Sequence, residues 1–189
     1  DTAIVGTGLG TPALGQYRYA FRIANTPFGV ILAGAAYVIF PAFSRIAADA
    51  ERLRAAFLRS LRWIAAIGFP AGMILVPLGP ALAVLVFGEV WRPAGEAAVA
   101  ICAYTGATSI SSVVSEGLKA DGRPQRLVHM HSLTAIVTIV VMLAMLPFGL
   151  TAVASGLSVG AIAGAAYAIR AARQELGVPT DAMWRERWP

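Results

Sequence analysis

The sequence predicts an all-α integral membrane protein with about five full transmembrane helices and one truncated helix. Of its 189 residues 58% are hydrophobic and 13% charged, whereas a soluble domain carries about a quarter charged residues. Uncharged runs such as residues 23–43 match the roughly 30 Å hydrocarbon core at 1.5 Å per residue. Twelve of the fifteen Lys and Arg residues fall in three clusters between the apolar runs, which is typical of membrane topology signals.

The first nine residues, DTAIVGTGL, are apolar but too short to span a membrane. We expect them to be the end of a truncated helix, so that the chain starts inside a longer protein. The segment shows no charged n-region and no small-residue cleavage site, so we do not expect it to be a secretory signal. Thr11-Pro12 and Gly15 predict a turn after this segment.

A long helix is predicted over residues 13–43. Arg18, Arg22 and Asn25 share one of its faces, at spacings i, i+4 and i+7. Pro27 is expected to kink it. We expect this helix to cross the membrane and to be followed by a basic segment at the membrane surface.

Residues 44–62 form that basic connection, which becomes the next helix with Asp49 as its N-cap. Residues 63–87 are uncharged and contain three prolines, so we expect a kinked span to about Leu78 and then a short broken helix. Gly68 and Gly72 form a GxxxG packing face. Residues 88–93 are predicted to form an outer loop.

The span predicted over residues 96–117 is unusually rich in hydroxyl groups. Either these groups bond back to the carbonyls of their own helix, or the helix lines a water-filled cavity. The hydroxyl residues are Thr105, Thr108, Ser109, Ser111, Ser112 and Ser115.

Two further spans are predicted over residues 127–146 and 151–169, after a short basic loop at residues 119–126. The last span carries Gly156, Gly160 and Gly164, a stripe of small residues that allows close helix approach. The chain then becomes basic and polar, and residues 183–189 either lie on the membrane surface or are disordered.

The three basic clusters can lie on one side of the membrane only if five full helices follow the truncated one, and the count agrees. By the positive-inside rule, residues 44–62, residues 119–126 and the C-terminus are expected to be cytoplasmic. Because the net charge of +5 is distributed in this way, it indicates topology and contact with anionic lipids, and no nucleic-acid partner is expected.

No catalytic constellation can be assembled from this sequence, so we do not expect an enzyme. Cys102 is the single cysteine, which rules out an internal disulfide, and no metal-ligand spacing occurs. The glycines of GTGLG lack the spacing and the βαβ context of a dinucleotide site. No cofactor is expected.

Several segments resemble one known family at family-like spacing: LGQYRYAFRIANTPFGVIL, VIFPAFSRIAADAERLRAAFLRSLRWIAAIGFP, LVFGEVWRPAGEAAVAI and LKADGRP. They are similar to the C-terminal half of Wzx-like polysaccharide flippases, members of the multidrug/oligosaccharidyl-lipid/polysaccharide exporter superfamily. The resemblance covers about residues 1–173. It therefore assigns residues 1–173 to a C-terminal transmembrane lobe and residues 174–189 to a cytoplasmic tail.

The resemblance implies one lobe of a two-lobe alternating-access transporter in the bacterial inner membrane, with the N-terminal lobe missing from this chain. Its substrate would be an undecaprenyl-diphosphate-linked oligosaccharide, flipped from the inner to the outer leaflet for polysaccharide or O-antigen export. The lipid tail would stay in the bilayer, so membrane lipids are further partners.

The resemblance also implies a candidate site. Arg22 falls in YAFR, where the related lipid II flippase has a cavity arginine, and a guanidinium suits a diphosphate. Arg22 and Arg18 either face this cavity or extend to the outer headgroups. The remaining candidates for substrate contact are Asn25, Thr105, Ser109 and Ser112.

Two other sets of residues each have two interpretations. Glu116 is either an ion- or proton-coupling group or a loop-edge charge that pairs with Lys119. His129 and His131 are expected to contact headgroups rather than relay protons.

The sequence is also compatible with other functions. A cation-coupled multidrug exporter of the same superfamily would favour an acidic residue in mid-span, and none of the ten acids lies there. A lipid II flippase, a non-transporting membrane subunit and a membrane enzyme are three further candidates. The short outer loops argue against the enzyme, and the polar helix faces argue against a mere scaffold.

Overall fold

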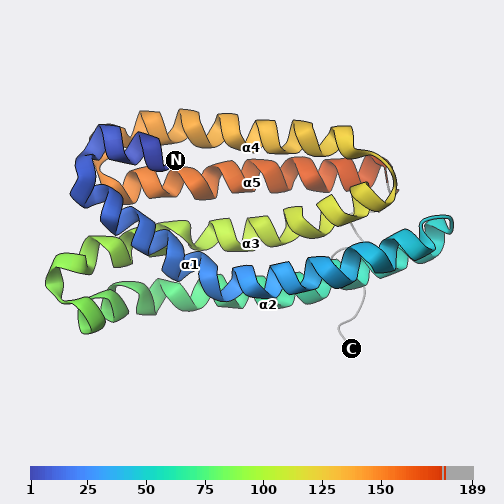
Figure 1. Ribbon diagram of the computed structural model, residues 1–189, viewed down its shortest axis with the longest axis horizontal. Helices are drawn as coiled ribbons and strands as arrows, with labels where there is room; N and C mark the ends of the chain where they lie inside the picture. Colours follow the sequence, from blue (N-terminus) through green and yellow to red (C-terminus); the bar gives the residue numbers. More distant parts are fainter. Residues whose placement is uncertain (176, 178–189) are drawn as a thin grey trace.

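The computed structural model describes residues 1–175 and residue 177, and within them every regular element is a helix. Long helices lie side by side in an elongated bundle (Figure 1). Their bounds are α1 Thr2–Ile46, α2 Ala50–Phe87, η1 Glu89–Trp91, α3 Arg92–Ala120, α4 Pro124–Met145, η2 Leu146–Phe148 and α5 Leu150–Glu175. The all-α fold class is confirmed.

The helix α1 consists of two segments that meet at Gly10. This glycine has φ 86° and ψ 173°, a conformation that favours glycine because it has no Cβ. The predicted short first helix is therefore present, but the break comes before Thr11, and Pro12 lies in the first turn of the second segment, where its missing N–H costs nothing. From there the helix continues to Ile46, and the kink at Pro27 stays a prediction.

The helix α2 begins at the predicted cap. Asp49 accepts a hydrogen bond from the Arg52 backbone N–H at 3.1 Å, which satisfies one of the free donors of the first turn. The segments Ala50–Ile74 and Val76–Phe87 are inclined by 51°. The bend thus comes before the predicted break at Leu78. The reason is that Pro77 has no backbone N–H to donate and its ring clashes with a carbonyl of the preceding helical turn, so the helix bends on the N-terminal side of the proline.

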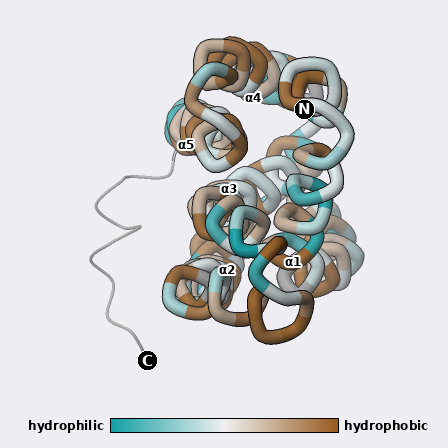
Figure 2. Tube along the Cα trace, turned by 90° about the vertical axis from the view of Figure 1, so that its left-hand side faces the viewer, coloured by the Kyte–Doolittle hydropathy of each residue, from teal (hydrophilic) through white to brown (hydrophobic). Residues whose placement is uncertain are grey.

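The helix α3 is the centre of the bundle. It packs against α1, α2 and α5, and in the end-on view it lies between them (Figure 2). More than half of the α3 and α5 spans is buried (56% each), against 6% for the α1 span and 11% for the α4 span. The outer helices therefore present most of their apolar surface to the outside of the bundle.

Glycines allow α2 and α3 to approach at the level of their backbones. A Cβ on Gly72 would lie 2.9 Å from the carbonyl oxygen of Cys102, and one on Gly95 would lie 2.5 Å from the Cα of Pro80. The packing role predicted for Gly72 is confirmed. That of Gly95 was not predicted, because a single glycine gives no spacing signal.

The glycine stripe of α5 accepts side chains from α4. Added Cβ atoms at Gly156, Gly160 and Gly164 would collide with Met142, Thr138 and Thr134, respectively. The predicted close approach is confirmed, and α4 is its partner.

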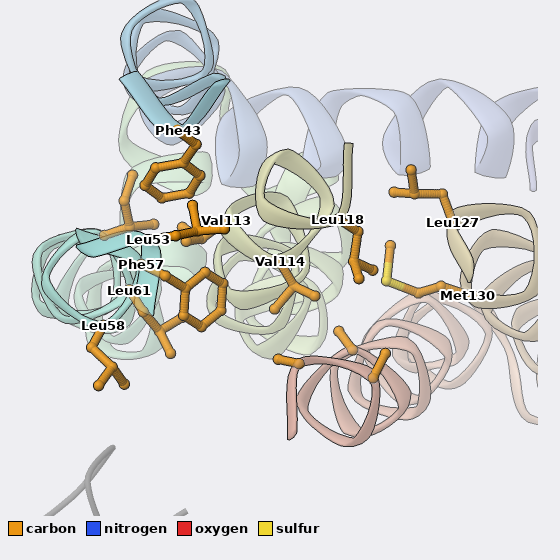
Figure 3. Close-up of a cluster of buried hydrophobic side chains, with 14 residues drawn as sticks. Phe43, Leu53, Phe57, Leu58, Leu61, Val113, Val114, Leu118, Leu127 and Met130 are labelled. Atoms are coloured by element: carbon orange, nitrogen blue, oxygen red, sulfur yellow. The ribbon is translucent and has the colours of Figure 1, made fainter. Parts of the chain in front are cut away.

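A large apolar cluster closes the bundle at its basic end, where Phe57 of α2 contacts Phe43 of α1 and the α3 residues Val113, Val114 and Leu118 stand between α2 and α4 (Figure 3). Leu127 and Met130 of α4 and alanines of α5 complete the cluster. All five helices therefore share this core.

Four helices of the described chain are long and apolar enough to cross a membrane, and the bent α2 makes a fifth if it counts as one span. This agrees with the five full spans predicted from the sequence. The predicted tail, residues 174–189, lies outside the described residues apart from positions 174, 175 and 177, and so does the segment 183–189.

We predict that Gly95→Ala lowers the melting temperature of the protein in detergent, because the added methyl group meets the α2 backbone and overpacking costs about 1–3 kcal/mol. The matched control is Gly34→Ala, since a Cβ at Gly34 meets nothing within 4 Å. The control should leave stability unchanged or raise it, because alanine favours helix. Equal melting temperatures for the two variants would show that the α2–α3 contact is not this close.

Candidate functional site

The candidate site lies on α1, whose second segment has distinct inner and outer faces. Tyr17, Ala20 and Ala24 are buried against α3, at spacings of three and four residues. Arg18 and Arg22 lie on the neighbouring stripe and are exposed. Both predicted arginines therefore point away from the core of this bundle.

Asn25 lies where α1 meets the hydroxyl-rich part of α3. Its neighbour Ala24 offers a backbone carbonyl to the Thr105 hydroxyl, which donates to it at 3.4 Å. Asn25 is half-buried, and its amide group lies along α1 beside Gly29. The structure thus brings Thr105 and Asn25 to one junction, below the two exposed arginines.

The α3 hydroxyls mostly bond to their own helix. Ser109 donates to the Thr105 carbonyl at 2.6 Å, Thr108 to that of Tyr104, and Ser115 to that of Ser111. Thr105 and Ser109 are buried, while Ser112 is half-buried. Backbone bonding, one of the two interpretations of the sequence, therefore accounts for most of this hydroxyl cluster, and Ser112 is the most exposed of the three α3 candidates.

Glu116 forms the ion pair that was one of its two predicted roles. Its Oε1 lies 2.8 Å from Nζ of Lys119, and 10% of its side chain is exposed, against 46% for the lysine. The pair borders a pocket of about 340 Å³ between α1 and α3. The pocket is lined by Ala36, Tyr37, Phe40, Pro41, Glu116 and Lys119.

A second ion-pair cluster, unforeseen in the sequence, connects the start of α4 to the end of α5. The Glu175 carboxylate, with 8% of its side chain exposed, pairs with Arg126 at 2.6 Å and with Arg123. Arg123 also pairs with Asp121 at 2.9 Å. Sequence reasoning treated the two arginines only as topology signals, because their partner lies about fifty residues away.

Ser158 of α5 was also missed, although its hydroxyl bonds to two backbone groups of α3. Its hydroxyl donates to the Ala100 carbonyl at 2.6 Å and accepts from the Tyr104 N–H at 3.1 Å. In a regular α-helix these two groups pair with each other. The serine hydroxyl thus contacts both partners of one backbone pair of α3, one residue from Thr105.

An aromatic cluster closes the opposite end of the bundle. Tyr19 of α1 contacts Phe87 and Trp91 edge-on, with centroids 4.7 and 4.9 Å apart. Gln16 donates its amide N–H to the Val90 carbonyl at 2.9 Å. The loop that follows α2 is therefore held against α1 one turn away from Arg22.

The described residues hold no group of three or more His, Cys, Asp or Glu side chains arranged to bind a metal ion. His129 and His131 are exposed in the first two turns of α4. Their position near the basic end is compatible with headgroup contact, which stays a prediction.

A family of polysaccharide biosynthesis proteins matches residues 1–96, just over half of the chain. A lipopolysaccharide biosynthesis protein, WzxC of Escherichia coli, is 29% identical over 123 residues, which cover 65% of this chain and 25% of that protein. TuaB of Bacillus subtilis, a teichuronic acid biosynthesis protein, is 32% identical over 94 residues, covering 50% of this chain and 20% of TuaB.

A Klebsiella pneumoniae membrane protein of the cps region is 40% identical over 90 residues, covering 48% of this chain and 19% of its own length. The chain thus spans about a quarter or less of the length of these relatives. No solved structure matches the chain.

We predict that Ser158→Ala destabilises the protein by about 0.6–1.7 kcal/mol, the range of hydrogen bonds between helices in membranes. The control is Ser155→Ala on the same helix, since Ser155 donates only to the Ala152 carbonyl of α5 itself. Denaturation of the purified protein in mixed detergent measures both. An effect of Ser158→Ala no larger than that of the control would show that the serine does not join α3 to α5.

Proposed function

The chain belongs to the polysaccharide biosynthesis protein family, that of the Wzx-like flippases, and we propose that it forms one lobe of a transporter that flips lipid-linked oligosaccharides. The cargo would be a polyprenyl-diphosphate-linked saccharide, moved from the inner to the outer leaflet of a bacterial inner membrane. The family match and the multi-pass helices support a transporter-type membrane protein rather than an enzyme.

The observation that carries this proposal is the pair of exposed arginines on α1. Ionised side chains of a membrane-spanning helix avoid hydrocarbon, and such residues tend to contact substrate, headgroups or solvent. Arg18 and Arg22 lie one turn apart on one stripe, outside the apolar window Gly29–Ile46, and they offer planar, permanently charged donors. Two such groups one turn apart match the several oxygens of a diphosphate.

The position of these arginines along α1 defines what they can reach. Arg22 lies 24 residues before the end of α1, about 36 Å along the helix axis. It is therefore near the membrane face opposite the basic end of the bundle. We assign the arginines to the outer mouth of the pathway, where they would hold the diphosphate as it arrives.

Asn25 and Ser112 are assigned to sugar contact, since both are half-buried and carry polar groups that match sugar hydroxyls. Thr105 and Ser109 are buried; in this proposal Thr105 holds α1 against α3 beneath the contact surface, while Ser109 bonds within α3. Glu116 is the candidate for ion or proton coupling, and displacement of Lys119 from the pair would be the coupled step.

A multidrug exporter is not favoured. The described part of the chain has no acidic side chain in the middle of a span, and the buried Glu116 is already paired near the end of α3. None of the three relatives is named for drug export.

The proposed orientation places the α1–α2 connection and the α3–α4 turn in the cytoplasm. The basic residues near these connections support it by the positive-inside rule. The η1 loop, with its aromatic cluster, would then face outward, and Tyr19 and Trp91 would lie at the outer interface, where such rings collect.

We predict that Arg22→Ala in the intact protein reduces surface polysaccharide at least about tenfold in a flippase-deficient strain, because loss of one charge-assisted contact costs at least about 1.4 kcal/mol. Arg22→Lys should restore part of the activity, since it keeps the charge but not the planar donor pair. Arg52→Ala is the control, an exposed arginine in a surface ion pair.

Membrane insertion of each variant is measured alongside. Full activity of a normally inserted Arg22→Ala variant would remove the arginine from the pathway. Restoration of dye extrusion rather than of polysaccharide by the wild-type protein would favour the exporter.

For the orientation, we predict that Val90→Cys reacts with a membrane-impermeant maleimide added to whole cells, whereas Gln125→Cys reacts only after the membrane is opened. Both side chains are exposed, in the η1 loop and in the first turn of α4. Cys102 is replaced by alanine in both variants so that it contributes no label. The reverse labelling pattern would invert the proposed topology.

A further inference from the structure

An apolar groove lies on the face of the bundle where α2 and α5 diverge. Both helices pack extensively on α3 but hardly on each other, so α3 forms the floor and the other two form the walls. The end-on view shows α2 and α5 on either side of α3 (Figure 2). The groove has a volume of about 490 Å³, within the usual range of ligand pockets.

The lining of the groove is suited to hydrocarbon alone. Its walls carry Met73 and Val76 from α2 and Ile162 and Ile169 from α5, and its floor carries Ala103 and Ile110. Met73 is 68% exposed and Ile162 is 52% exposed, although both belong to membrane-spanning helices. These side chains therefore need an apolar neighbour that the described chain does not provide.

The length of the groove suits a lipid chain. On α3 the lining runs from Cys102 to Ile110, about 12 Å along the axis. A flexible acyl chain can follow the groove over this length, because about 12 Å is most of one leaflet of a core about 30 Å thick.

Arginines stand at one end of this groove. On α5, Arg173 follows Ile169 by four residues and so continues the same face. On α2, Arg62 precedes Met73 by eleven residues, close to three turns, and so lies on the face that lines the groove. Arg59 and Arg170 flank them, and both are exposed.

We infer that the groove between α2, α3 and α5 binds an acyl chain of an anionic phospholipid, with the lipid phosphate at Arg62 and Arg173. Basic residues at the end of a cleft between transmembrane helices are suited to anionic headgroups. None of the described lining residues belongs to α1, so this site is separate from Arg18 and Arg22 and does not depend on the proposed transport. The bound lipid would fill the gap between two helices that hardly touch.

The experiment uses the intact protein in nanodiscs of phosphatidylcholine, with or without added phosphatidylglycerol, and measures the melting temperature and the lipid retained in native mass spectrometry. Ala166→Phe fills the groove from its exposed α5 wall, and Ala103→Phe fills it from the floor. The matched control is Ala144→Phe, on the exposed side of α4 away from the groove. Arg62→Gln combined with Arg173→Gln tests the headgroup end.

Phosphatidylglycerol should raise the melting temperature of the wild-type protein and of Ala144→Phe, and should remain bound to both. Either groove-filling variant should retain at least about tenfold less of it, and the double arginine variant should lose the preference for phosphatidylglycerol over phosphatidylcholine. Variants are compared only if their melting temperature in pure phosphatidylcholine matches that of the control. Two groove-filling variants are used so that the test does not depend on the correct folding of either one.

Three results would overturn the inference. One is equal stabilisation by the two lipids in the wild-type protein. Another is unchanged retention of phosphatidylglycerol in the groove-filling variants. The third is retention of a polyprenyl phosphate in place of the phospholipid, which would assign the groove to the transported substrate.

Discussion

The constraint on which this structure depends is that helices in lipid gain little hydrophobic energy by associating, so they must pack at close range. In this chain, glycines allow such close packing. Gly72 and Gly95 bring the backbones of α2 and α3 together, and Gly160 and Gly164 receive threonines of α4. These contacts fix α3 at the centre, and the position of α3 in turn sets which faces of α1 and α5 are covered.

Polar groups divide into two kinds according to this packing. Inside the bundle, the hydroxyls of Thr105, Ser109 and Ser158 are buried and bonded to backbone carbonyls. Thr105 and Ser158 join α3 to α1 and α5 in this way, while Ser109 bonds within α3. Outside it, Arg18 and Arg22 lie on an exposed stripe. Because these two arginines are not buried in the packing of the helices, their charges are the ones available to a substrate.

Much of the fold could be predicted from the sequence, because span length, charge clusters and capping are local signals. The five spans, the Asp49 cap and the α5 glycine stripe follow from them. The break at Gly10, the contact of Gly95 and the bonds of Ser158 to α3 depend on which helices meet, and no local pattern encodes that. The site is less predictable still, because the exposure of Arg22 was not readable and the groove between α2 and α5 has no linear motif.

The ion pairs of Glu175 have a consequence for how the protein assembles. Arg123 and Arg126 fasten α4 to α5 at one end, the α5 glycines fasten the two along their length, and α4 packs on little else. This helical hairpin therefore contains nearly all the contacts that α4 needs. It is a unit that can form on its own soon after both helices enter the bilayer, and then dock onto α3 as a preassembled piece.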